Sequence, residues 1–289
     1  MRPHPTARMV IAFAATCAAF ALGTAPAAAH ACDQPWCYSA TPYLWLPNMN
    51  GEVSYRLTTL PGTNGTIVCA PSCTVDVAME PSAYLQNLKF VGMLTAEATN
   101  GHWGLSIDCI NFNFSGGSSD IVEASGPHGP LRIPEDFEST TSVVGTIVTM
   151  AISHPIVDHA TLYGEALAGF RETALSAQTQ WDAGSSSGSL ASGSSISKEV
   201  EPTDLIAGLK GQWHVNHRLF VPYYVDVGAG TRSSTWQGII GVGYGENASV
   251  ELVYRNLAYT SASKQYTSSS DAFTNTKFEG PALGYTFRF

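Results

Sequence analysis

Eight histidines stand among the residues of this 289-residue chain that could do chemistry. His214 and His217 share the stretch HVNH, which could suggest a metal site. Zinc needs three or four ligands, and on a strand followed by a tight turn this spacing points the two imidazoles apart. No third ligand is evident nearby, so we predict ordinary turn histidines, with no metal and no cofactor.

Another histidine, His128, lies between two Gly-Pro pairs in an acidic segment that also holds Asp120, Glu123, Glu135 and Asp136. A membrane-embedded lipid A deacylase, phospholipase or protease would need a Ser or an Asp beside such a histidine. A solvated acidic loop explains the same composition. We therefore predict no catalytic residue, with catalysis in this segment as the competing hypothesis.

The overall charge is low and acidic. Only 13% of the residues are charged and the formal net charge is −9, whereas an average soluble domain has about 25% charged residues. Lys and Arg are scattered, so the chain lacks the basic patch that nucleic-acid binding requires. We predict no nucleic-acid partner.

Side chains alternate between apolar and polar along ten segments, which is the period of a β-strand. In the last segment Leu283, Tyr285, Phe287 and Phe289 share one face, opposite small or polar residues that include Arg288. The same pattern occurs at 38–46, 89–98, 103–109, 144–152, 162–171, 204–213, 218–228, 236–244, 250–255 and 280–289. The chain is therefore predicted to be all-β, with about ten strands and a range of eight to twelve.

The polar faces of these strands carry few charges, and the two signs nearly balance. They are Glu97, Asp108, Glu165, Arg171, Lys210, Asp226, Glu251, Arg255 and Arg288. A soluble sandwich would turn this face to water and carry many more charges there. A closed transmembrane barrel accounts for the pattern better, because lipid takes the apolar face and a narrow lumen holds paired ions. We predict that these nine residues form a charge network in the lumen.

Connections and aromatic residues agree with an antiparallel up-and-down barrel. Short turns at TNGH, VNHR and GENAS alternate with long predicted loops at 47–88, 115–140 and 181–203. Outer-membrane barrels have short periplasmic turns and long outer loops. Aromatic residues near strand ends fit girdles at the two membrane interfaces; they are Trp103, Trp213, Trp236, Tyr244, Tyr254 and Phe289.

The N-terminal region 1–31 has the features of a cleaved signal peptide, with a basic start, a short apolar run and the small-residue stretch APAAAHA. We expect residues 32–289 to form one exported barrel domain. Export permits disulfides, and Cys32 with Cys37 and Cys69 with Cys73 are close enough in sequence to pair, although sequence cannot fix the connectivity.

Several motifs together resemble a widespread family of uncharacterised bacterial outer-membrane β-barrel proteins, distantly similar to the OmpA-type transmembrane barrel. The motifs are TPYLWLPNMNGEV, WGLSIDCINFNFS, DLIAGLKGQWHVNHRLFVPYYVDVGAG, TWQGIIGVGYG, VELVYRNLAY and the ending GYTFRF. The resemblance covers most of the expected mature chain. It implies location in the cell outer membrane, contact with membrane lipid and lipopolysaccharide, and recognition of Phe289 by the outer-membrane assembly machinery. The family supplies no substrate and no catalytic residue.

The sequence thus favours a barrel with a mostly occluded, charge-paired lumen and a structural or surface role. Barrels of about eight strands are filled by their own side chains, while open channels belong to barrels of about sixteen. The alternative is a narrow solute-uptake channel in which Tyr43, Trp45, Tyr163 and Tyr224 line a path for a small molecule.

Overall fold

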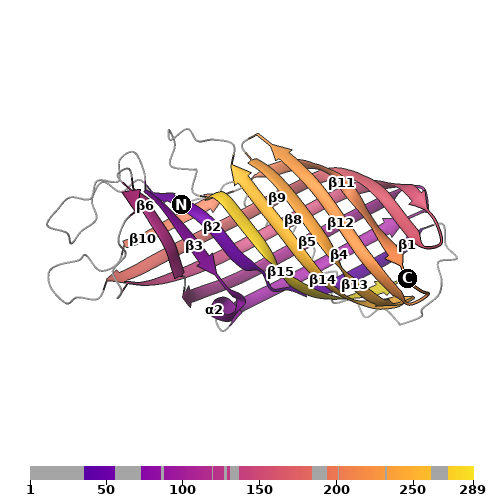
Figure 1. Cartoon of the computed structure of the whole chain (residues 1–289), viewed down its shortest axis with the longest axis horizontal. Coiled ribbons are helices and arrows are strands. Elements are labelled where there is room, and N and C mark those ends of the chain that lie inside the picture. Colours follow the sequence, from indigo (N-terminus) through magenta and orange to yellow (C-terminus); the bar gives the residue numbers. More distant parts are fainter. Residues whose placement is uncertain are drawn as a thin grey trace, which may run out of the picture.

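The computed structural model describes residues 36–55, 73–85, 88–118, 120–126, 129–130, 137–183, 194–200, 202–231, 233–261 and 273–289. The predicted signal peptide, 1–31, and His128 lie outside the described residues. Ten strands form a closed antiparallel barrel (Figure 1). In order around the wall they are β1 (Cys37–Trp45), β4 (Leu88–Thr99), β5 (Gly104–Ser118), β8 (Phe137–Asp158), β9 (Leu162–Ala183), β11 (Thr203–His214), β12 (Leu219–Gly230), β13 (Ser233–Gly245), β14 (Ala248–Ser261) and β15 (Phe273–Arg288).

Pairing of the first strand with the last closes the barrel. Tyr38 and Phe289 exchange two backbone hydrogen bonds of 2.9 Å, and their rings stack with centroids 6.2 Å apart. The prediction of about ten transmembrane strands is confirmed, including a first strand near 38–46 and a last strand that ends at the carboxyl terminus.

Tight turns join the strands at one end of the barrel, which we call the short-turn end. In the turn at Asn100–Trp103, the Asn100 side chain accepts hydrogen bonds from the backbone N–H groups of His102 and Trp103, and Gly101 adopts a φ of 80°. Asn216 accepts the same two bonds from Arg218 and Leu219. Such bonds are the reason Asn and Gly suit these turns.

The opposite end, which we call the long-loop end, is more regular than predicted. The segments predicted as long loops contain β2 (Asn48–Tyr55), β3 (Cys73–Met79), the helix α2 (Pro81–Leu85), β6 (Asp120–Gly126), β7 (Gly129–Pro130) and β10 (Ser194–Val200). β2 continues the pairing along β15, and β3, β6 and β7 follow in the same sheet. The loop prediction was wrong here. β2 and β3 do alternate, with Met49, Val53, Val75 and Val77 on one parity of their strands. At eight and seven residues, however, each is shorter than a membrane-spanning strand of about 9–11 residues.

The one described helix, α2, has five residues. No helix in the described ranges is long and apolar enough to cross a bilayer.

Apolar side chains cover the outer wall. Large apolar residues on the expected lipid face remain highly accessible, such as Leu205 at 74%, Val227 at 64% and Leu283 at 55%. The same holds for every aromatic residue predicted to form a girdle: Trp103, Trp213, Trp236, Tyr244, Tyr254 and Phe289 are 45–59% exposed. In a folded protein so many exposed apolar side chains indicate a surface that does not meet water.

A cluster of buried apolar residues lies on the inner side of the wall, which the sequence did not predict. It comprises Trp45, Met93, Ile110, Phe112, Ile147, Leu175, Leu257, Tyr259, Phe278 and Ala282. Ile110 and Phe112 have the same parity along β5 as the inward Asp108, and Leu257 has the same parity along β14 as Arg255. We call this cluster the apolar layer. It fills part of the lumen that was expected to hold paired ions.

Truncation of the apolar layer should be costly. Leu257 is 0% exposed, and Leu257→Ala is expected to lower the free energy of unfolding by about 2–5 kcal/mol, because a buried cavity replaces packed side chain. Denaturant titration of the refolded barrel in detergent measures this. Leu209→Ala, at an outward position that is 44% exposed, should cost much less; equal losses at the two sites would argue against a packed interior.

Candidate functional site

Backbone register gathers polar residues into one row on the inner wall. Direct cross-strand partners lie side by side on the same face of a sheet. Following such partners from strand to strand gives Thr41, Thr95, Asp108, Thr149, Arg171, Asp204 and Gly230 in succession. Residues far apart in sequence thus form a continuous polar row that holds two of the ion-pair members described below.

Arg171 and Asp226 form a buried, bidentate ion pair. The Arg171 Nη1–Asp226 Oδ1 distance is 3.1 Å and the Nη2–Oδ2 distance is 2.5 Å, and both side chains are 0% exposed. The guanidinium also donates to the hydroxyls of Thr149 and Thr235. A Cβ at Gly208, on the intervening strand β11, would lie 2.8 Å from the Asp226 Cβ. The Val225 backbone oxygen would lie closer still, so glycine at this position allows the close approach of β12, the strand that carries Asp226.

Arg255 and Asp108 form a second pair, which crosses the lumen. Arg255 is on β14 and Asp108 on β5, with β15, β1 and β4 between them along the wall. The Nη2–Oδ2 distance is 2.7 Å, and Arg255 also donates to Tyr43 and Gln237. The guanidinium lies 4.9 Å from the Trp45 ring centroid, which is a cation–π contact.

The carboxylate of Asp108 accepts two further hydrogen bonds, from the Tyr43 hydroxyl at 2.7 Å and from the Thr95 hydroxyl at 2.9 Å. Both partners of this ion pair are therefore hydrogen-bonded by neutral groups as well. That arrangement offsets part of the desolvation cost of placing charges inside the barrel.

Lys210 lies between two carboxylates, at 2.8 Å from Glu97 and 3.3 Å from Glu165. Glu165 also accepts a hydrogen bond from the Tyr163 hydroxyl. Glu97 and Lys210 are on β4 and β11, separated by β5, β8 and β9 along the wall, so this pair also crosses the interior.

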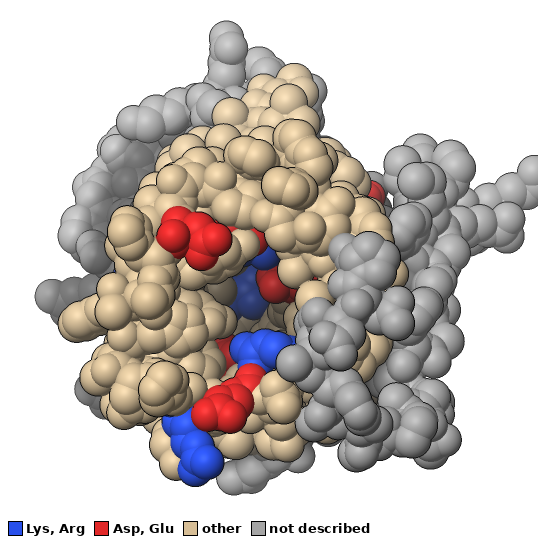
Figure 2. Space-filling view, turned by 90° about the vertical axis from the view of Figure 1, so that its right-hand side faces the viewer, with Lys and Arg blue, Asp and Glu red and all other residues tan. Residues whose placement is uncertain are grey.

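Exposure falls from the short-turn end toward the middle of the barrel. The side chains of Glu97, Lys210, Arg255 and Arg171 are 41%, 15%, 4% and 0% exposed. Figure 2 looks into one end of the barrel and shows a hollow with basic and acidic residues inside it. We call this hollow the vestibule. Glu97 is partly exposed, whereas the side chains of Arg255 and Arg171 are buried.

Glu251 and Arg288 lie nearer the short-turn end. The Glu251 carboxylate accepts hydrogen bonds from Ser249 and Thr286, and Arg288 donates to the carbonyl oxygen of Glu246 in a turn. Seven of the nine residues expected in the lumen network thus make ion pairs within the described ranges, while these two make hydrogen bonds instead.

Sequence reasoning left Asp204 out of the network. Asp204 is 1% exposed, its Oδ1 accepts a hydrogen bond from Ser233 at 2.5 Å, and its Oδ2 has no hydrogen-bond partner. The alternation along β11 places Asp204 on the polar face, and this parity was the signal by which the sequence could have revealed it as a lumen residue. Gln237 was also left out, although it contacts Arg255.

The histidines within the described ranges lie at the short-turn end. His214 ends β11 with its ring 6.0 Å from that of Phe220, and His217 lies in the following turn. His154 Nδ1 contacts the backbone oxygen of His102 at 2.7 Å. The described part of the chain contains no group of three potential metal ligands among His, Cys, Asp and Glu.

Two of the four cysteines expected to form disulfides, Cys32 and Cys69, lie outside the described residues. Cys37 begins β1 and Cys73 begins β3. The two pairings therefore stay predictions.

No protein-family model and no curated protein matches the sequence. Among solved structures, the chain is similar to the outer-membrane protease OmpT from Escherichia coli, with a TM-score of 0.55, 11% identity, and 91% of this chain and 100% of that chain covered. The chain has the fold of a bacterial outer-membrane β-barrel. At this identity the similarity concerns the fold alone. The resemblance to outer-membrane barrels that the sequence motifs indicated is therefore confirmed at the level of the fold.

Two weaker similarities were found. Ail from Yersinia pestis has a TM-score of 0.30 and 9% identity, with 88% of this chain and 98% of that chain covered. The translocator domain of the autotransporter NalP from Neisseria meningitidis has a TM-score of 0.37 and 14% identity, with 98% of this chain and 97% of that chain covered. The fold assignment rests on the first comparison.

Proposed function

We propose that this outer-membrane barrel has a mostly occluded, charge-paired lumen and a structural or surface role without catalysis. The observation that carries the proposal is that inward side chains in the middle of the barrel are inaccessible to solvent. Arg171, Ile110 and Leu257 come from β9, β5 and β14 and are all 0% exposed. In a continuous water-filled channel, the inward side chains would be exposed to solvent. Ion pairs that cross the interior add a second obstruction to flow.

Planar-bilayer conductance tests this proposal. The refolded mature barrel, with insertion verified by heat-modifiable migration on gels, should give no stable conductance steps. Reproducible steps that scale with salt concentration would overturn the occluded lumen and favour the channel.

A narrow solute-uptake channel is the second candidate, and the vestibule is the observation that favours it. Tyr43 and Tyr163 contact the charged groups of the vestibule, so an aromatic or polar solute that reaches the vestibule on its way to the short-turn end would meet hydroxyls and both signs of charge. Uptake of radiolabelled small solutes into proteoliposomes measures this; uptake no faster than into empty vesicles removes the candidate.

Absence of catalysis is proposed although one solved structure of similar fold is a protease. The support is that His102, His154, His159, His214 and His217 all lie at or next to the turns of the short-turn end, whereas Asp226 and Asp108 pair with arginines inside the barrel. Purified protein should turn over neither peptides nor lipid A. Turnover that disappears in His128→Ala would contradict the proposal.

We further propose that the short-turn end faces the periplasm, that the outer wall contacts membrane lipid and lipopolysaccharide, and that the assembly machinery reads Phe289. The accessibility of Phe289, at 59%, supports recognition of its ring. Phe289→Ala should reduce the amount of heat-modifiable protein in the outer membrane and increase degraded or periplasmic material. Unchanged amounts in both fractions would remove the signal role.

A further inference from the structure

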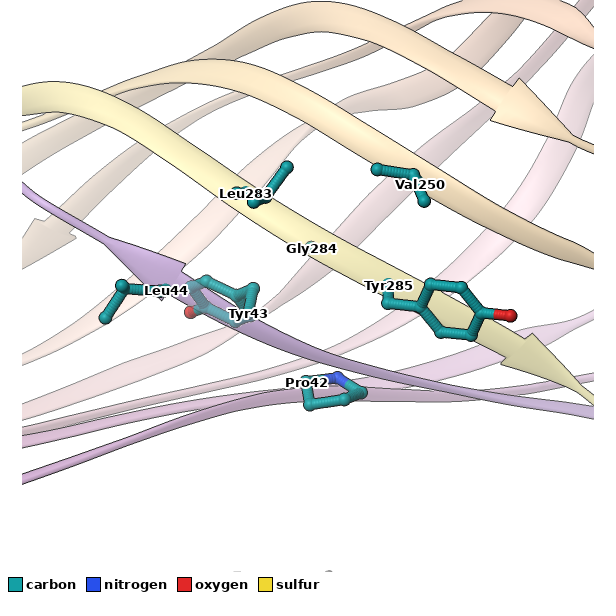
Figure 3. A pocket seen from close by; sticks show the side chains of 7 residues that line it. All are labelled: Pro42, Tyr43, Leu44, Val250, Leu283, Gly284 and Tyr285. Carbon is teal, nitrogen blue, oxygen red and sulfur yellow. The ribbon is translucent and has the colours of Figure 1, made fainter.

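A hollow of about 390 Å³ lies along the seam where the first and last strands meet. Figure 3 shows Pro42 and Leu44 extending from β1, Leu283 and Tyr285 from β15, and Val250 from β14 around it. We call this hollow the seam groove. It is a shallow depression that is wide open to the outside of the barrel.

A proline accounts for the position of the seam groove. The β1–β15 register runs through Ala40↔Phe287 and resumes at Tyr43↔Gly284, without a registered partner for Pro42 on β15. On its other side Pro42 is registered with Leu94 of β4. Since proline has no N–H to give to the ladder, the pairing is interrupted on the β15 side. The groove lies where the closing seam has this interruption.

The seam groove belongs to the lipid-facing wall. Leu44, Val250, Leu283 and Tyr285 are 41–55% exposed and have the outward parity of their strands. The surface is continuous with the apolar outer wall on either side. At this depth the surrounding medium is hydrocarbon, and an empty hollow among apolar side chains would lose dispersion contacts. An acyl chain is the molecule available to fill it.

The depth of the seam groove in the bilayer determines which lipid leaflet it faces. Leu283 and Tyr285 lie six and four residues before Phe289 at the short-turn end, which places them roughly 10–15 Å from that rim on a tilted strand. If the short-turn end faces the periplasm, as the proposed function states, the groove opens into the inner, phospholipid leaflet. We propose that the seam groove is a binding site for one phospholipid acyl chain.

The site also touches the interior. Tyr43 borders the groove, while its hydroxyl bonds to Asp108 and Arg255 in the lumen. An acyl chain in the groove would therefore pack against a residue that holds the cross-lumen ion pair in position.

Photo-crosslinking tests the proposal. The mature barrel is reconstituted with phosphatidylethanolamine that carries a diazirine in the acyl chain, irradiated, digested and mapped by mass spectrometry. Crosslinks should be several-fold more frequent on β1 and β15 at the groove than on equivalent outward positions of β12 and β13. Val250→Trp, which fills the groove, should reduce them to the level of the surrounding wall.

Val242→Trp is the matched control, since Val242 is also an outward valine, 52% exposed, on the neighbouring strand β13. It should leave the crosslinks at the groove unchanged. Equal crosslinking around the whole wall, or equal loss in both variants, would overturn the acyl-chain site while leaving the barrel in the membrane. Absence of crosslinks anywhere on the wall would contradict the membrane placement itself. Both leaflets contain the probe, so the result does not depend on orientation.

Discussion

Arg171→Ala is expected to lower the free energy of unfolding by about 3–5 kcal/mol, because Asp226 would remain as a buried charge without its partner. Both side chains of the pair are 0% exposed, so water cannot replace the lost guanidinium. Denaturant titration in detergent micelles, or the temperature at which the band changes mobility on a gel, measures the loss.

Two further variants distinguish the effect of an unpaired buried charge on stability from the effect of losing any arginine. Arg218→Ala removes an arginine that is 63% exposed and 3.8 Å from Glu246, and exposed pairs contribute little to stability, so its unfolding curve should overlay that of wild type. The Arg171→Met/Asp226→Leu double variant removes both charges and should recover much of the loss. Equal stability of Arg171→Ala and Arg218→Ala would contradict a buried pair.

Leu252→Arg should destabilise the barrel by up to about 2–4 kcal/mol, because a cation on the lipid-facing wall is costly and the cost grows with depth in the bilayer. Leu252 lies on β14, and its side chain is 59% exposed. On a water-soluble protein an arginine at such an exposed position would be tolerated. The variant therefore tests whether the accessible face meets hydrocarbon, and reversible unfolding in lipid vesicles measures its cost.

Val215→Arg is the control for this change. Val215 is 53% exposed but lies in a turn at the short-turn end, where an arginine can reach water. Its stability should stay close to wild type. If both arginines were tolerated equally, the outer wall would be facing water.

Much of the fold could be predicted from the sequence because a lipid-facing strand must be apolar at every second residue. The row Leu283, Tyr285, Phe287 and Phe289 shows this period clearly, and the other barrel strands follow it over part of their length, with exceptions such as Asn111 and Thr146 on β5 and β8. Strands beyond the apolar band carry no such requirement. β3 and β10 pair with β2 and β9, but each has only seven residues, fewer than the about 9–11 of a spanning strand, and the segments that contain them were predicted as loops.

The candidate site was less predictable. Parity placed Arg171, Asp226, Asp108 and Arg255 on the polar face, but parity cannot say which of them meet. Pairing depends on register and on which strands lie across the barrel, so Arg255 and Asp108 meet although 147 positions separate them in sequence. The apolar layer was missed for a related reason: Leu257 is apolar at an inward position, so the alternation is weaker there.

Accessibility of spin labels to oxygen and to a water-soluble nickel chelate tests the orientation of the wall most directly. A single label at Leu283 or Ile240, which are 55% and 60% exposed, should collide often with oxygen and rarely with the chelate in reconstituted vesicles. A label at Val215 should show the reverse. Frequent collision of the chelate with labels at Leu283 and Ile240 would mean that the apolar face meets water, and the account of a lipid-facing wall around a charge-paired lumen would be wrong.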